Sequence, residues 1–227
     1  MTSTNLALFD LDHTLLPIDT DREWVDFLAR NNLAGDPVAI QQKNHELMEK
    51  YTAGILKIEE SAEFMLSFLK MHSPYDLARF HEQFMCEVVR PTIQASAIDL
   101  VRQHQENGDL CCIVTATNSF VTSPVARAFG IEHLIGTLPE YVNGRFTGRV
   151  QGVPSYKEGK VTRVNMWLES MGKKLDDFTE SYFYSDSQND LPLLEVVSNP
   201  VATNPNEFLR KTAHENGWPV LDLFALK

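Results

Sequence analysis

Three cysteines are all that the 227-residue chain contains, and they lie at Cys86, Cys111 and Cys112. Three thiols cannot form a disulfide framework, which excludes the class of small proteins held together by disulfides. Cys111 and Cys112 are neighbours within an apolar run that predicts a buried strand, and free cysteine is often fully buried. We therefore interpret these residues as reduced core thiols.

Basic residues are also few, because 20 Lys and Arg stand against 31 Asp and Glu, which gives a formal charge of −11. This balance repels a phosphate backbone, so we expect no nucleic acid partner. Carboxylates are, however, the natural ligands of a hard cation such as Mg²⁺. The composition therefore favours a divalent cation as a partner.

Long hydrophobic runs are missing as well. No basic residue precedes Arg22, and Asp10 and Asp12 interrupt the first apolar stretch, so the pattern predicts neither a signal peptide nor a membrane span. We expect a cytoplasmic protein without a membrane partner. With 43% apolar and 22% charged residues, the chain has an ordinary globular composition, and its length suits one domain with a large insertion or two modest domains.

Short apolar runs separated by helical patterns are what the chain does contain. The runs predict strands buried on both faces of a parallel sheet, and we place them at 6–9, 110–114 and 182–184, with weaker candidates at 134–135, 201–202 and 220–223. One helix is expected to open at Ser123 and Pro124 and to end at Gly130, and another ends at Gly172. This alternation predicts an α/β fold with a doubly wound parallel sheet, a Rossmann-like core.

A large insertion separates the first two predicted strands. A parallel crossover needs about a dozen residues or more, yet 95 residues run from Leu15 to Asp109. Trp24, Phe27 and Leu28 have helical spacing, and similar patterns continue through the segment. We predict a helical cap over residues 16–89, and an α/β catalytic core over residues 1–15 and 90–227.

A small β-hairpin is predicted at Asn143-Gly144, which lies between two short segments that alternate in polarity. This dipeptide is a strong signal for a two-residue turn. We expect the hairpin to project from the otherwise parallel sheet beside the site.

Two groups of acidic residues directly follow predicted strands. Asp10, Asp12 and Thr14 come after the first strand, and Asp186 and Asp190 come after the strand at 182–184. Ligands of open α/β sheets bind at the carboxyl ends of strands, and two acidic groups at neighbouring strand ends repel each other unless a cation lies between them. The alternatives are a surface Asx turn for the first group and a helix N-cap for the second.

Two further residues occupy positions where a phosphate oxygen is commonly bound. Thr115 follows the strand at 110–114, so its hydroxyl and the backbone N–H groups of Ala116 and Thr117 are candidate donors to phosphate. Lys160 begins a helical pattern, with Lys157 as a rival three residues earlier. The alternatives are a turn-forming threonine and a solvated surface lysine.

In this order, Asp10-x-Asp12-x-Thr14, Thr115, Lys160 and Asp186-Ser187-x-x-Asp190 resemble the four motifs of the haloacid dehalogenase superfamily. The helical insertion after the first motif resembles the cap of its phosphoserine phosphatase-like branch. The resemblance covers about residues 5 to 205. It departs from the family pattern at His13, where a small residue is frequent, and Lys157 stays an alternative to Lys160.

The resemblance implies an Mg²⁺-dependent phosphatase that forms an aspartyl-phosphate on Asp10. Asp12 would protonate the leaving oxygen and then deprotonate the water. Family members that dehalogenate lack this second aspartate, and ion pumps carry threonine there, so Asp12 favours a phosphatase. The metal would be held by Asp10, the backbone carbonyl of Asp12, and Asp186.

The remaining motif residues would have supporting roles. The resemblance implies that Thr115, Ala116 and Lys160 bind the phosphate oxygens, and that Asp190 orients Lys160 or a metal-bound water. Thr14 would support the first motif. The cap would close over the site, exclude water and select the leaving group.

The substrate is expected to be a small phosphomonoester, either phosphoserine-like or histidinol phosphate. Arginine is the side chain best suited to bind a substrate carboxylate, and none lies between Arg30 and Arg79. Asp19 or Asp21, directly after the first motif, is a candidate to face a substrate amine, and solvated helix surface is the alternative for these acids. This balance favours a cationic substrate without a carboxylate, such as histidinol phosphate.

Two other classes of function are alternatives. A catalytically silent sensor of a phosphorylated ligand would have the same fold, and receiver-like signalling modules also gather Asp, Thr and Lys around Mg²⁺. Receivers accept phosphate after a later strand and lack a cap of this size. A zinc hydrolase is disfavoured because none of the seven histidines has metal-site spacing, and the sequence leaves the oligomeric state open.

Overall fold

The computed structural model describes residues 5–53 and 55–224. The first part of the chain forms β1 (Leu6–Phe9), α1 (Thr20–Arg30), α2 (Pro37–Thr52), α3 (Ile58–Met71), α4 (Pro74–Phe84), the π-helical turn η1 (Met85–Val89), the 3₁₀ turn η2 (Arg90–Thr92) and α5 (Ala95–Glu106). The middle part forms β2 (Leu110–Asn118), α6 (Ser119–Ala128), β3 (His133–Thr137), β4 (Pro139–Val142), β5 (Arg145–Val150) and α7 (Glu158–Ser170). The last part forms η3 (Leu175–Asp177), β6 (Ser181–Ser185), η4 (Gln188–Asp190), α8 (Leu191–Leu194), β7 (Asn199–Thr203), α9 (Glu207–Asn216) and β8 (Val220–Leu221). Within the described residues, no helix is both long and apolar enough to cross a membrane.

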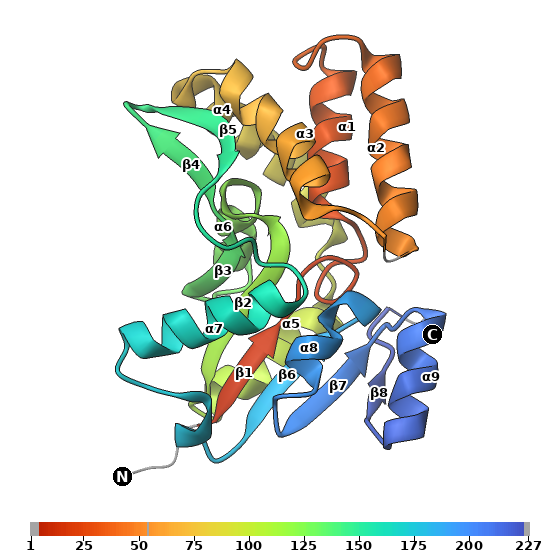
Figure 1. The fold of residues 1–227 in the computed structure, drawn as a ribbon, viewed down its shortest axis with the longest axis vertical. Coiled ribbons are helices and arrows are strands. Elements are labelled where there is room, and N and C mark those ends of the chain that lie inside the picture. The colour runs from red at the N-terminus through yellow and green to blue at the C-terminus, as the bar shows by residue number, and fades with distance from the viewer. Residues whose placement is uncertain (1–4, 54, 225–227) are drawn as a thin grey trace.

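The sheet has six parallel strands in the order β3-β2-β1-β6-β7-β8, which confirms the predicted α/β fold (Figure 1). β1 lies between β2 and β6, and Phe9 pairs with Ile113 on one side and Tyr184 on the other. The chain first moves outward through β2 and β3 and then returns to the other side of β1. The strand order therefore reverses at β1, where open α/β sheets bind their ligands.

Helices cover both faces of the sheet, and for this reason β1 is apolar at every position. Ala7 and Phe9 face the apolar cluster that includes α5 and α6, whereas Leu6 and Leu8 face the cluster that includes α7, α8 and α9. All four side chains are fully buried. The alternation of successive side chains between the two faces explains how one short strand contributes to both.

The insertion is helical, as predicted, and it shares an apolar core with one face of the sheet (Figure 1). Trp24 of α1 is 1% exposed, and its ring centroid lies 5.3 Å from that of Phe84 in α4 and 5.9 Å from that of Phe120 in α6. The base of the insertion is therefore packed onto the core by aromatic side chains. The division into domains at residues 15 and 89 stays a prediction.

The predicted hairpin forms at Asn143 and Gly144, which both have positive φ angles of 51° and 78°. β4 and β5 are antiparallel, and β5 packs against α3 of the insertion (Figure 1). At Gly148 of β5, a Cβ atom would lie 3.3 Å from Cδ of Lys70. The hairpin therefore extends from the parallel sheet, and its strand β5 packs against the insertion (Figure 1).

Two predicted boundaries around the second strand were wrong. β2 continues beyond residue 114 to Asn118, with a shift of register against β3 between Val114 and Asn118. α6 then begins at Ser119, because the Asn118 side chain accepts a hydrogen bond from the backbone N–H of Val121 and caps the helix. Pro124 consequently lies inside α6 and does not open it.

Replacing Trp24 with alanine is expected to lower the free energy of unfolding by about 3–5 kcal/mol, because a large buried side chain is lost and a cavity remains. Urea denaturation followed by circular dichroism would measure the change. Val38→Ala is the control, since Val38 is 73% exposed, and its effect should stay within about 0.5 kcal/mol. Equal losses in the two variants would contradict the packing described for Trp24.

Candidate active site

The ends of β1, β2 and β6 bring the candidate residues together. Asp10 directly follows β1, and its backbone N–H donates to the carbonyl of Tyr184 in β6 at 2.9 Å. Asp186 directly follows β6, and Thr115 lies in β2 where the register shifts. Parallel pairing thus places residues that are far apart in the sequence at one edge of the sheet.

A buried ammonium group links two of the acidic residues. Nζ of Lys160 lies 2.7 Å from Oδ1 of Asp10 and 2.7 Å from Oδ2 of Asp190. Burial acts to lower the pKa of Lys160, but the two carboxylates outweigh it and hold that pKa above its usual value. Burial raises the pKa of Asp190 to about 6, although Lys160 and a hydrogen bond from Ser185 act against the rise.

Gly159 allows α7 to begin close enough to deliver Lys160. A Cβ atom at position 159 would lie 2.1 Å from the carbonyl oxygen of Pro154. Any larger residue would push the start of α7 away from this segment. The small residue before Lys160 is therefore required by the close approach of two backbone segments.

The structure distinguishes Lys160 from Lys157 and shows which partners Asp190 binds. Lys160 enters the acidic cluster, whereas Nζ of Lys157 lies 5.3 Å from the centroid of the Tyr156 ring. Asp190 occupies the N-cap position of α8, but its side chain makes no capping hydrogen bond. It accepts instead from Lys160 and Ser185, each at 2.7 Å.

Thr14 connects Asp10 to Asp186. Its hydroxyl lies 3.1 Å from Oδ2 of Asp10 and 3.4 Å from Oδ1 of Asp186, so it is shared between the two carboxylates. Burial, followed by repulsion from Asp10 and Asp190, raises the pKa of Asp186 well above its usual value. Burial also raises the pKa of Asp10, so the arrangement concentrates negative charge where water is scarce.

Asp12 is held by a separate set of hydrogen bonds. Oδ1 accepts from the backbone N–H and the hydroxyl of Thr20 at 2.7 and 2.6 Å, and Oδ2 accepts from the hydroxyl of Thr117 at 2.8 Å. The hydroxyl of Thr115 lies farther from Oδ2, at 3.5 Å. Burial and then repulsion from Asp19 raise the pKa of Asp12 above its usual value.

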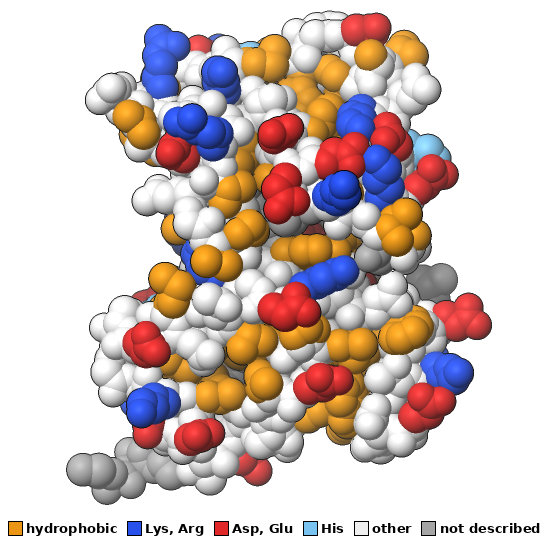
Figure 2. Space-filling model, viewed as in Figure 1, with side chains coloured by type: hydrophobic (Ala, Val, Ile, Leu, Met, Phe, Trp, Pro, Cys, Tyr) orange, Lys and Arg blue, Asp and Glu red, His pale blue; other side chains and the backbone are white. Residues whose placement is uncertain are grey.

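A cavity of about 720 Å³, including its open mouth, lies between the insertion and the carboxyl edge of the sheet. The predicted site residues that line it are Asp10, Asp12, Asp19, Asp21, Thr115 and Ala116, whereas Thr14, Lys160, Asp186 and Asp190 are not among its lining residues. The insertion adds a largely apolar wall from Leu47, Met48, Tyr51, Leu56 and Met65. Figure 2 shows that the molecular surface narrows between the insertion and the core.

Acidic residues from the start of α1 dominate one side of the cavity. Asp19 caps α1 by accepting from the backbone N–H of Arg22 at 2.8 Å, and Asp21 accepts from Nδ2 of Asn118 at 2.9 Å. Burial and then repulsion from Asp19 and Asp12 raise the pKa of Asp21 well above its usual value. Arg22 also lines the cavity. The expectation of a substrate without a carboxylate considered only arginines between residues 30 and 79, and Arg22 lies before that range.

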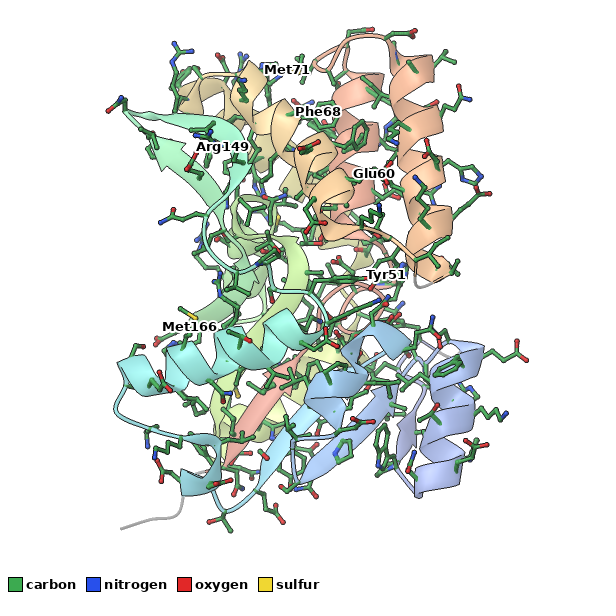
Figure 3. The ribbon with its side chains drawn as sticks, in the orientation of Figure 1. Tyr51, Glu60, Phe68, Met71, Arg149 and Met166 are labelled. Carbon is green, nitrogen blue, oxygen red and sulfur yellow. The ribbon has the colours of Figure 1, made fainter. Side chains whose placement is uncertain are left out.

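Four further residues contact the site but were missed from the sequence. Thr117 was expected only as a backbone donor to phosphate, and its hydroxyl also binds Asp12. Tyr51, in the last turn of α2, points toward the core (Figure 3), and its ring centroid lies 6.3 Å from that of Tyr156. No motif marks these tyrosines. The missed residues are Thr20, Tyr51, Tyr156 and Ser185.

Residues 7–195 match the haloacid dehalogenase-like hydrolase family. A histidinol-phosphatase of Neisseria meningitidis serogroup C is 44% identical over 219 residues, which cover 96% of this chain and 98% of that protein. The match therefore spans nearly the whole of both chains.

The solved structures that are similar to this chain include the two described next. A protein of unknown function from Bordetella pertussis Tohama I has a TM-score of 0.94 at 59% identity, over 98% of this chain and 100% of that one. A substrate-bound phosphoserine phosphatase has a TM-score of 0.69 at 17% identity, over 97% of this chain and 94% of that one. At that identity, the second likeness shows a shared fold.

Replacing Lys160 with methionine is expected to lower the free energy of unfolding by about 3–5 kcal/mol, because Asp10 and Asp190 would be left as unpaired buried carboxylates. Urea denaturation in the presence of a chelator would measure this loss without contributions from metal. Lys157→Met makes the same chemical change outside the cluster, and we expect a loss below about 1 kcal/mol. A loss in Lys160→Met as small as that in Lys157→Met would contradict the buried pairing.

Proposed function

The chain belongs to the haloacid dehalogenase-like hydrolase family, and from this premise we propose an Mg²⁺-dependent reaction through an aspartyl-phosphate. The enzyme is a phosphoric monoester hydrolase. The observation that carries the proposal is the pair of carboxylates, Asp10 and Asp12, that line one cavity from one strand end. Only Asp10 is also bound to a buried ammonium group, that of Lys160.

The oxygen atoms around Thr14 fit a hard cation. Oδ2 of Asp10 and Oδ1 of Asp186 flank one hydroxyl, and Mg²⁺ commonly uses one or two carboxylates together with waters and substrate phosphate. Among the described residues, no three His, Cys, Asp or Glu side chains are grouped so that they could hold a metal ion by themselves. We propose that Asp10 and Asp186 would hold the ion together with the backbone carbonyl of Asp12, waters and substrate phosphate. When bound there, Mg²⁺ would offset the negative charge of the phosphoryl oxygens.

Asp10 and Asp12 would divide the chemistry between them. A carboxylate oxygen of Asp10 attacks phosphorus, the bond from phosphorus to the leaving oxygen breaks, and the phosphoryl group becomes bonded to Asp10. Asp12 gives its proton to the leaving oxygen, and then takes a proton from the water that releases inorganic phosphate. The raised pKa of Asp12, which burial causes, supports its protonated form in the first step.

The charge of the phosphoryl group would be balanced by residues around Asp10. Lys160 supplies a fixed positive charge, and Asp190 holds the ammonium group in place. The hydroxyl of Thr115 and the backbone N–H of Ala116 would bind phosphate oxygens, because both residues line the cavity beside Asp10. Thr14 would keep Asp10 and Asp186 at a constant separation.

The cavity favours a substrate with an amine. Asp19 and Asp21 add two carboxylates near Asp12, and their mutual repulsion would be relieved by a cationic group. Tyr51 and Tyr156 add aromatic surface, which suits a leaving group that carries a ring. Histidinol phosphate has an amine and an imidazole ring but no carboxylate, and we propose it as the substrate. The name of the Neisseria relative supports this choice.

Phosphoserine is the second candidate, and Arg22 is the observation that favours it. Arg22 lines the cavity, where its guanidinium group would be a partner for a substrate carboxylate. That group already lies 3.8 Å from the Asp26 carboxylate. Binding phosphoserine would therefore compete with an ion pair within α1, which makes it the weaker candidate.

Asp10→Asn is expected to lower kcat for 4-nitrophenyl phosphate by about 1,000-fold or more, because an amide is not a nucleophile for phosphorus. Release of 4-nitrophenol in Mg²⁺ would be measured by absorbance. Asp222→Asn is a matched control that makes the same chemical change. Asp222 is an exposed carboxylate on the C-terminal segment, where it pairs with Arg210. A kcat of Asp10→Asn close to that of the control would overturn the mechanism.

Histidinol phosphate is expected to be hydrolysed with a kcat/KM about 10-fold or more above that for phosphoserine, because the cavity is richer in carboxylates than in arginine. Asp21→Asn keeps the side-chain shape while removing a charge. It should lower kcat/KM for histidinol phosphate about 10-fold but change that for 4-nitrophenyl phosphate, which has no amine, by less than about 3-fold. Faster hydrolysis of phosphoserine by the unmodified enzyme would refute the substrate assignment.

A further inference from the structure

Asn204 makes four hydrogen bonds between two distant segments of the chain. Its Nδ2 donates to the carbonyls of His13 and Thr14, at 3.1 Å each. Its Oδ1 accepts from the backbone N–H groups of Leu223 and Phe224, at 2.7 and 3.2 Å. Both donors and both acceptor positions of one amide are therefore used.

The two carbonyls that Asn204 binds belong to the loop that carries the proposed nucleophile. His13 has a φ angle of 59° and Asn204 one of 47°. Residues other than glycine adopt this left-handed conformation infrequently, and such positions persist when the surrounding structure holds them. Asn204 binds the carbonyls of His13 and Thr14, so it holds the loop at the residue with positive φ, His13.

Thr14 connects Asn204 to the carboxylates of the site. The backbone of Thr14 is bound by Asn204, while its hydroxyl lies between Asp10 and Asp186. A rotation of the peptide between His13 and Thr14 would move this hydroxyl and change the separation of the two carboxylates. A displacement of even about 1 Å in a site of this kind can lower the rate strongly.

The other end of the amide is held by the C-terminal segment. The backbone N–H of Asn204 donates to the carbonyl of Leu221 at 2.8 Å, which adds to the two bonds that its side chain accepts. Asn204 is itself buried to an intermediate degree. The C-terminal segment thus orients the Asn204 side chain, and Nδ2 of that side chain binds the loop that carries Asp10.

We propose that Asn204 is a positioning residue for phosphoryl transfer, and that it acts by holding the backbone of His13 and Thr14. The inference rests on the proposed function of Asp10. Asn204 is not among the residues that line the cavity. Loss of its side chain should therefore impair the chemical step and leave substrate binding largely intact.

Asn204→Asp tests the link to the catalytic loop selectively. The aspartate keeps an oxygen that accepts from Leu223 and Phe224, but it places a second oxygen against the carbonyls of His13 and Thr14. We expect kcat for 4-nitrophenyl phosphate to fall about 10-fold or more, with KM changed by less than about 3-fold, because ground-state binding is retained. Asn204→Gly, which favours the left-handed backbone but removes both links, should show the same split.

Asn206→Ala is the structural control, because it removes the side-chain cap of α9 two residues away. Its kcat should stay within about 3-fold of the unmodified enzyme at a temperature where all variants are folded by circular dichroism. An unchanged kcat in both Asn204 variants, or an equal loss in Asn206→Ala, would overturn the inference. Failure of the proposed function is distinguishable, because Asp10→Asn would then keep a kcat for 4-nitrophenyl phosphate close to that of the unmodified enzyme.

Discussion

The ammonium group of Lys160 is the interaction on which the site depends. Asp10, Asp186 and Asp190 converge where β1 and β6 end, and burial alone would make three neighbouring carboxylates unfavourable as ions. Lys160 lies 2.7 Å from two of them and offsets much of this cost. In the proposed function, a second cation held by Asp10 and Asp186 would offset the remaining negative charge. The carboxylates that repel one another in the described structure would then be stabilised when metal and a phosphoryl group bind.

Parallel pairing made the fold and the acidic cluster predictable from the sequence. The runs at 6–9 and 182–184 are apolar because both faces of their strands are buried, and parallel register brings the next residues to one edge. Asp10 and Asp186 could therefore be predicted to lie at one edge, whereas Lys160, at the start of α7, was expected from the resemblance to the family. The extension of β2 to Asn118 could not, because a register shift between Val114 and Asn118 leaves no periodic signal.

Contacts made by the insertion were beyond sequence reasoning for a related reason. Helical spacing predicts which faces of α1 to α4 are apolar, but it does not predict which end of a helix approaches the sheet. Tyr51 and Arg22 reach the cavity because of the packing of α1 and α2 on the core, set by aromatic contacts such as that of Trp24 with Phe120. Figure 2 also shows acidic and basic side chains crowded over α2 and α3, where Lys43 and Lys50 both bind Glu60. The contacts of Asn204 could not be predicted, because its four side-chain partners are backbone groups that no sequence pattern marks.

The central claim is that the phosphoryl group passes through a covalent bond to Asp10. Borohydride reduction during turnover of 4-nitrophenyl phosphate measures this directly, because it converts an acyl phosphate to an alcohol that peptide mass spectrometry can locate. We expect the reduced residue at position 10, and only when substrate is present. Reduction at another carboxylate, or an unmodified Asp10 during sustained turnover, would contradict the account.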